Sequence, residues 1–247
     1  MALKIATYNL RAGGRGLEHW RAMTSVLGAD ILLLQETADP AVLISGLDEY
    51  NAHWRPVSTG EKLLPWGSAA IVRGAVRRAF CLDGFEGWVV GVEVEAPSAF
   101  AEGKPVRIFS LHAPTRPNTS YAASVNAALD GLRPLGDGAH LIIGGDFNLT
   151  ISSTLDGDAR KITRQEEAIH DRLREEFGLV NCWRAANPAA PLAQTLRWTR
   201  DPRIMNHIDG IFAPASWAAA LRRCDVVSGD VWDRLSDHNP VIATFEG

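Results

Sequence analysis

Residues 140–150 have the sequence HLIIGGDFNLT, which joins a short apolar run to a group of polar side chains. The apolar half consists of β-type residues and predicts a buried strand that ends in a turn at the glycine pair 144–145. Asp146 and Asn148 follow two positions apart, so both can point the same way while Phe147 points back into the core. We expect the two glycines to let the backbone approach a ligand closely.

The same pattern, an apolar strand with a polar residue at or beside its end, recurs along the chain. Further strands are expected at residues 4–10, 29–36, 106–111, 208–212 and 241–245. The polar residues beside them are Asn9, Glu36, His112, Asp209, Asp237 and His238. Because unpaired polar groups are costly to bury, we expect these residues to converge with Asp146 and Asn148 in one cleft beyond the strand ends.

The region 52–95 is rich in β-type residues separated by turn signals, which predicts strands at 53–57, 67–73, 76–80 and 88–95. Short connections imply that neighbouring strands are antiparallel. Alternation after Trp88 is typical of a half-exposed strand, and we assign Trp88 no catalytic role.

Helical periodicity predicts three helices. The first spans 18–27 and is closed by Gly28. The second spans 119–132, with Thr119 or Ser120 as its cap and Pro134 as its end. The third spans 158–177, and its apolar stripe consists of Ile162, Ile169, Leu173 and Phe177.

The segment 182–203 is irregular and rich in Trp, Pro and Asn. Trp183 and Trp198 are the aromatic residues there that we expect to be exposed, and such a loop is a candidate for substrate contact. Packing of both tryptophans on the core is the alternative. The sequence shows no internal repeat.

The 247 residues are 46% hydrophobic and 22% charged, which is typical of a globular protein, and we expect a single domain over 1–247. The three cysteines are too few and too widely spaced for a disulfide framework or a metal knuckle, so we expect reduced packing residues. The sequence has no apolar segment typical of a signal peptide or membrane span, and a cytoplasmic protein is predicted.

The net charge of −4 argues against a protein that coats nucleic acid with a general basic surface, although a local basic cleft remains compatible with it. Cations gather at Arg11 and Arg15, at Arg160, Lys161 and Arg164, and at Arg197, Arg200 and Arg203. These groups either line one mouth or are simply solvated.

The chemistry of the converging residues favours Mg²⁺ or Mn²⁺, because hard oxygen ligands without cysteine suit these ions. Histidines can transfer protons or donate to phosphoryl oxygens, and amides can fix a water molecule. Zinc is disfavoured because HExxH is absent, and a serine hydrolase is disfavoured because GxSxG is absent.

The motifs YNLRAGG, LLLQE, SLHAP, IIGGDFN, HIDGIF and SDHNPV resemble, in order, those of the endonuclease/exonuclease/phosphatase family of divalent-metal phosphoesterases, over almost the whole chain. The resemblance implies an α/β fold, a four-layer α/β sandwich in which two packed, mostly antiparallel β-sheets are flanked by helices.

The resemblance also implies roles for the converging residues. Glu36 is the principal metal ligand, with Asn9 and Asp237 close to the metal; Asp146 and Asn148 position water and phosphate; Asp209 orients His238; and His112 acts on the phosphate or leaving group. Among these we assign Asp146 to the attacking water, with the Asp209–His238 pair as the rival base.

Two departures bear on the branch of the family. Arg11 follows Asn9 where abasic-site endonucleases carry an acidic residue, and His112 stands where they carry a tyrosine. The sequence is therefore more similar to the deoxyribonuclease-like and sphingomyelinase-like branches. Glu61 is the nearest candidate for the glutamate that partners the histidine in deoxyribonucleases.

The leading hypothesis is a metal-dependent phosphodiesterase, most simply a nuclease that acts on DNA as an endonuclease. Arg11, the cationic groups and Trp198 favour an extended polyanion as substrate. A phospholipid head group or an inositol phosphate is the alternative substrate. A catalytically inactive binding scaffold is the alternative from a different class.

Overall fold

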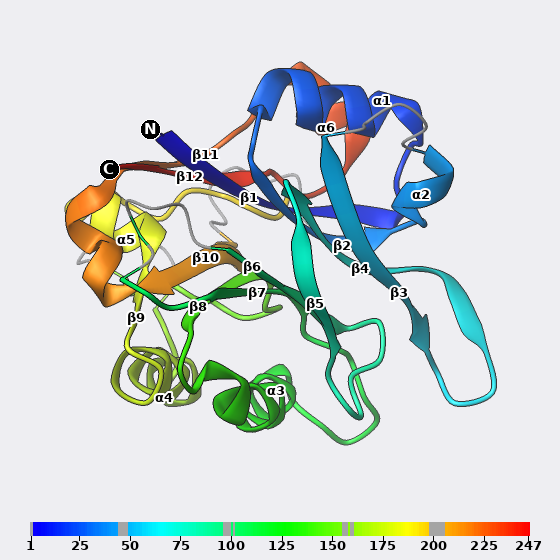
Figure 1. The fold of residues 1–247 in the computed structure, drawn as a ribbon. Coiled ribbons are helices and arrows are strands. Elements are labelled where there is room, and N and C mark those ends of the chain that lie inside the picture. Colours follow the sequence, from blue (N-terminus) through cyan, green and yellow to red (C-terminus); the bar gives the residue numbers. More distant parts are fainter. Residues whose placement is uncertain are drawn as a thin grey trace.

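The computed structural model describes residues 2–43, 49–95, 100, 102–154, 158, 161–197 and 206–247. Two six-stranded sheets pack face to face, and helices cover their outer faces (Figure 1). Helices α1 and α6 lie over the first sheet, and α3 and α4 lie under the second. The predicted four-layer α/β sandwich is confirmed.

The first sheet has the strand order β11-β12-β1-β2-β4-β3, and the second has the order β5-β6-β7-β8-β10-β9. The strands of the first sheet are β1 Ala2–Gly13, β2 Ile31–Thr37, β3 Tyr50–Ser58, β4 Leu63–Arg73, β11 Leu221–Val226 and β12 Val241–Glu246. Those of the second are β5 Val76–Cys81, β6 Val89–Val94, β7 Val106–His112, β8 His140–Asp146, β9 Leu179–Asn181 and β10 Asp209–Pro214.

The two sheets share one topology, a repeat that the sequence does not show. Taken in order across the sheets, β11, β12, β1, β2, β4 and β3 of the first sheet correspond to β5, β6, β7, β8, β10 and β9 of the second. Each sheet has one parallel pair at its centre, β1 with β2 and β7 with β8, and the other pairs are antiparallel. Since the carboxyl ends of parallel strands share an edge, each pair delivers its polar end residues together.

The helices are α1 Leu17–Arg21, α2 Pro40–Leu43, α3 Tyr121–Gly136, α4 Arg164–Glu175, α5 Cys182–Ala186 and α6 Asp230–Leu235. Helix α1 continues as the π-helical segment η1, Ala22–Leu27, and Gly28 closes it with a left-handed φ of 55°, as predicted. The 3₁₀ segment η2 spans Ala215–Ala220. Among the described residues, no helix is long and apolar enough to cross a membrane.

Two helix boundaries differ from the prediction. Ser120 caps α3, but Pro134 lies inside its last turn, where the missing N–H costs only one hydrogen bond. Helix α4 begins at Arg164 because Thr163 and Glu166 form a capping box, a stronger signal than the apolar stripe that had included Ile162.

Three apolar clusters fill the layers. One lies between the sheets and takes Ile5, Leu33, Ile108 and Ile142 from both of them. A second lies between the second sheet and α3 and α4, and a third lies between the first sheet and α1, η1 and α6. Strand β6 is buried on both faces over its first four residues, so the prediction of a half-exposed strand is wrong there.

Burial corrects the side-chain predictions for Trp183 and Cys81. Trp183 is not exposed but packs in the cluster between the sheets, as the alternative had it. Cys182 and Cys224 are free and buried in that cluster, as expected, whereas Cys81 is exposed and is not a packing residue.

The glycine pair at 144–145 lies inside β8 and not in a turn. A Cβ on Gly145 would lie 1.7 Å from the backbone oxygen of Leu111, and one on Gly144 would lie 2.7 Å from Leu33 Cδ1. The glycines therefore allow close packing of β8 on its neighbours, and the expectation that they face a ligand is wrong.

Candidate active site

A hollow of about 390 Å³ lies at the carboxyl ends of the two parallel strand pairs. The described residues that line it are Arg11, Glu36, Trp66, Trp88, His112, Ala113, Thr115, Tyr121, Asp146, Asn148, Leu196, Asp237 and His238. The expected convergence is therefore present, with Asn9 and Asp209 directly behind the lining residues.

A bulge in β2 presents Glu36 to the hollow. The pairing of β2 with β4 slips between Leu34 and Thr37, and Glu36 has a φ of 49°, which is uncommon for a residue with a side chain. Its carboxylate accepts hydrogen bonds from Ala12 N at 2.6 Å and from Asn9 Nδ2 at 3.2 Å. The irregular backbone and these donors together fix the direction of the carboxylate.

Asp146 ends β8 and is buried at the centre of the site. Asn148 N donates to its Oδ1 at 2.9 Å, and Asn9 Nδ2 donates to its Oδ2 at 3.0 Å. Nε2 of His112 and Nε2 of His238 each lie 3.8 Å from the same Oδ2. Burial and the nearby Asp209 raise the pKa of the Asp146 carboxyl above its ordinary value.

Asp209 and His238 form a buried ion pair. Nδ1 of His238 donates to the carboxylate of Asp209, whose oxygens lie 3.0 and 3.1 Å away. Burial alone lowers the pKa of His238, but the charge and hydrogen bond of Asp209 outweigh it and raise this pKa to about 9. At neutral pH His238 is therefore positively charged, with Nε2 on the side of Asp146.

His112 differs from His238 in its partners. Its Nε2 lies 3.8 Å from Glu36 Oε1, whereas its buried Nδ1 has no hydrogen-bond partner among the described residues. Burial lowers the pKa of His112, so the ring is neutral at pH 7. Glu61, the sequence candidate for a partner, lies exposed in the β3–β4 turn.

Asp237 and Arg11 lie on the rim. Arg11 Nε is 3.5 Å from Asp237 Oδ2, and the Arg11 side chain is 65% exposed. Trp198 lies outside the described residues, as do Arg160, Arg200 and Arg203, so their predicted contact with substrate stays a prediction.

Arg197 does not line the mouth, contrary to one sequence hypothesis. Its guanidinium donates to Asn239 Oδ1, Trp232 O and Ser236 O, and its backbone N donates to Asp237 O at 2.8 Å. It therefore holds the loop that carries the site residues at 237 and 238.

The donor set fits a hard divalent cation. The carboxylates of Glu36, Asp146, Asp209 and Asp237 gather here against the positive charges of Arg11 and His238. Ligand atoms of Asp146, Asp209 and His238 lie within 4.8 Å of one another. This excess of oxygen donors and negative charge is what Mg²⁺ and Mn²⁺ bind.

Asn9 is placed differently from the other residues expected near the metal. Its Nδ2 donates to Glu36 and to Asp146, and its Oδ1 accepts from Arg11 N at 2.9 Å. In this arrangement it orients two carboxylates.

Sequence reasoning missed the aromatic wall of the hollow and a polar contact behind it. Trp66, Trp88 and Tyr121 line the hollow although none was assigned to it. Gln35 Nε2 donates to Ser110 Oγ at 2.9 Å and thereby joins the two sheets. A polar residue inside the apolar run before Glu36 was the available signal for the latter.

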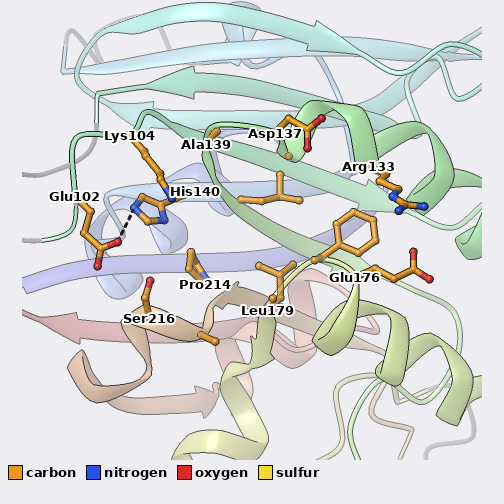
Figure 2. Close-up of a pocket in the computed structure, with 15 residues that line it drawn as sticks. Glu102, Lys104, Arg133, Asp137, Ala139, His140, Glu176, Leu179, Pro214 and Ser216 are labelled. Carbon is orange, nitrogen blue, oxygen red and sulfur yellow. Dashed lines mark ion pairs between the residues drawn. The ribbon is translucent and has the colours of Figure 1, made fainter.

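A second hollow, of about 500 Å³, lies at the other ends of β8 and β10, beside His140 and Pro214 (Figure 2). Its charged rim includes Glu102, whose Oε2 lies 3.7 Å from His140 Nε2. None of the residues predicted for catalysis lines it, so the smaller hollow is the candidate active site.

Comparison with known proteins gives the following matches. The sequence family described as "Endonuclease/Exonuclease/phosphatase family" matches residues 6–238. No curated protein matches the sequence.

Solved structures with the same fold include an AP endonuclease from Archaeoglobus fulgidus, with a TM-score of 0.73, 18% identity, and coverage of 99% of this chain and 100% of that one. The AP endonuclease LMAP from Leishmania major has a TM-score of 0.71, 19% identity, and coverage of 100% and 88%. The 3′ phosphatase NExo from Neisseria, bound to a product DNA hairpin, has a TM-score of 0.71, 20% identity, and coverage of 99% and 100%. At these identities the likeness shows the fold.

Proposed function

The chain belongs to the endonuclease/exonuclease/phosphatase family, and we propose that it hydrolyses phosphodiester bonds with a divalent metal ion, with nucleic acid as the leading substrate class. Proteins of this family are phosphoesterases and nucleases, which hydrolyse ester bonds. The proposed branch, deoxyribonuclease-like or sphingomyelinase-like, stays a prediction.

One observation carries the proposal. Oδ2 of Asp146 lies 3.8 Å from Nε2 of both His112 and His238, and Glu36 lies next to them in the same hollow. Phosphodiester hydrolysis needs an acceptor for the proton of water, donors for the phosphoryl oxygens and a cation to neutralise charge. These residues supply the acceptor and the donors within one hollow, and Glu36 would hold the cation.

Asp146 is the proposed base. Both of its oxygens are already oriented by Asn9 and the Asn148 backbone, and its raised pKa makes it a better proton acceptor than an ordinary carboxylate. It takes the proton of the attacking water. His238 already carries a proton at neutral pH, which argues against it as the base and makes its Nε2–H a donor to a phosphoryl oxygen.

His112 and Asn148 complete the proposed machinery. As a neutral imidazole, His112 donates a hydrogen bond from its Nε2–H to the phosphate or to the departing oxygen. The side chain of Asn148 donates to Ala113 O at 3.2 Å, which holds it on the same wall as His112. Asn148 thereby positions the phosphate or the attacking water.

Glu36 and Asp237 would hold the metal ion, with Asn9 orienting Glu36. When bound, a divalent ion neutralises charge on the phosphoryl oxygens. Mg²⁺ or Mn²⁺ is proposed because the donors are oxygen atoms. The carboxylate of Asp146, which shares the donor Asn9 with Glu36, adds negative charge near this position.

The substrate classes are separated by a panel assay with Mg²⁺ and Mn²⁺ on plasmid DNA, abasic duplex, single-stranded RNA, sphingomyelin and an inositol phosphate. The proposal predicts hydrolysis of a nucleic acid, abolished by chelator and by Asp146→Asn. Hydrolysis of sphingomyelin or inositol phosphate alone would support the alternative substrate class. Metal-dependent hydrolysis of none of them would support a binding scaffold.

A further inference from the structure

The wall of the hollow beside His112 is aromatic. Trp66, in β4, and Trp88, just before β6, are both half-buried and line the hollow from the two different sheets. Their rings meet edge to face, with centroids 5.8 Å apart and planes at 85°. The ring of His112 lies 5.0 Å from Trp88 and 6.2 Å from Trp66. The aromatic surface therefore adjoins the expected position of the phosphate.

The backbone holds this wall in place before any ligand binds. The carbonyl oxygen of Trp88 accepts from His112 N at 2.8 Å and from Ser68 Oγ at 3.1 Å. In the adjacent hydrogen bond, Ser68 N donates to Gly87 O at 2.8 Å. A Cβ on Gly87 would lie 2.2 Å from Pro56 O, so only glycine permits this junction of the two sheets. A wall fixed in this way loses little freedom when a ligand binds.

The charged residues that line the hollow also indicate which class of ligand it binds. Among its described lining residues, Arg11 carries the one permanent positive charge, and it is exposed and paired with Asp237. Polyphosphorylated ligands and duplex backbones are bound by several cationic side chains. This hollow instead offers two indole rings and the phenol ring of Tyr121, which suit a flat, weakly polar group.

We propose that Trp66 and Trp88 form a subsite that stacks one unpaired nucleobase next to the scissile phosphate. The inference rests on the proposed phosphodiesterase function and narrows its substrate to a single strand or a strand end. An unpaired base exposes the π-face that such rings bind, whereas a paired base is already stacked.

The test compares two substrates that share a backbone: an oligothymidylate single strand and a strand of equal length with baseless tetrahydrofuran units. Trp66→Ala should raise the KM for oligothymidylate by about tenfold or more, because stacking on an aromatic side chain is lost. Its effect on the baseless strand should be small. Trp66→Phe should restore much of the preference, and Leu63→Ala, which removes an exposed apolar side chain from the same strand, should leave both substrates unchanged.

Binding gives a readout that does not need turnover. In the Asp146→Asn background, labelled oligothymidylate should bind about tenfold more weakly when Trp66→Ala is added. Equal loss on both substrates, or no loss on either, would overturn the stacking subsite while leaving a working phosphodiesterase. If the wild-type protein neither binds nor hydrolyses either strand with Mg²⁺ or Mn²⁺, the proposed nuclease function fails and the subsite fails with it.

Discussion

The two carboxylate oxygens of Asp209 lie 3.0 and 3.1 Å from Nδ1 of His238, inside the protein. The sequence predicted this contact, and the structure confirms it. Because Asp209 fixes which nitrogen carries the hydrogen bond, Nε2 of His238 is directed to the side of Asp146. Asp209 therefore makes His238 a charged hydrogen-bond donor, which leaves the role of base to Asp146.

Asp209→Asn should lower kcat on a phosphodiester by on the order of a hundredfold or more, because the ring of His238 loses the charge that keeps it protonated and oriented. The amide keeps the shape of the side chain, so the fold should persist. Asp137→Asn is the matched control, since Asp137 lies in the second hollow. Unchanged kcat in Asp209→Asn, with folding verified, would remove the pair from the mechanism.

The roles of Asp146 and His112 can be distinguished by comparing substrates with different leaving groups. Asp146→Asn and His112→Gln should each slow hydrolysis by orders of magnitude, so activity loss alone does not distinguish them. With a good leaving group such as nitrophenolate, the His112→Gln defect should shrink and the Asp146→Asn defect should stay. The opposite pattern would mean that the two roles are reversed.

His19 predicts how stability depends on pH. The ring is fully buried and its Nδ1 accepts from Arg15 N at 2.6 Å. Burial and the charge of Arg15 lower its pKa to about 4. As the pH falls below about 6.5, His19 binds a proton in the unfolded chain but not in the folded protein. Its contribution to the free energy of unfolding therefore falls by about 3 kcal/mol between pH 6.5 and pH 4 and is constant below pH 4.

The test is denaturant unfolding of wild type and His19→Asn between pH 7 and pH 4. The asparagine can keep the hydrogen bond from Arg15 without titrating, so its loss of stability with falling pH should be smaller. His207 and His170, whose pKa values burial also lowers, keep part of the slope in both proteins. Identical slopes would contradict the assignment to His19.

The strand ends were predictable because each polar residue follows an apolar run directly in the sequence. Asn9, Glu36, His112 and Asp146 could therefore be placed at one edge from the amino-acid pattern alone. The shape of that edge was not predictable, because the bulge at Glu36 depends on pairing with two neighbouring strands.

Contacts between segments that are far apart in the sequence were also not predicted from it. Trp66 in β4 and Trp88 just before β6 belong to segments of different sheets, which come close together where Gly87 packs against Pro56. Arg197 resembled a surface cation, yet its guanidinium donates to Trp232 O in α6, to Ser236 O and to the Asn239 side chain. Such pairings leave no local pattern in a single sequence.

The prediction of one domain over 1–247 stays a prediction, but one feature supports it. The apolar cluster between the sheets contains Leu3 from the start of the chain and Phe245 from its end, together with Ile108 and Ile142 from the middle. Both sheets therefore depend on the same core.

The central claim is that this hollow hydrolyses phosphodiesters with a metal ion held at Glu36. The most direct measurement is the turnover of bis(4-nitrophenyl) phosphate against Mn²⁺ concentration for wild type, Glu36→Gln and the control Asp137→Asn. We predict turnover that requires metal in wild type and control, and a requirement for at least about tenfold more Mn²⁺, or no turnover, in Glu36→Gln. Metal-independent turnover in wild type, or the same Mn²⁺ dependence in Glu36→Gln, would contradict the claim.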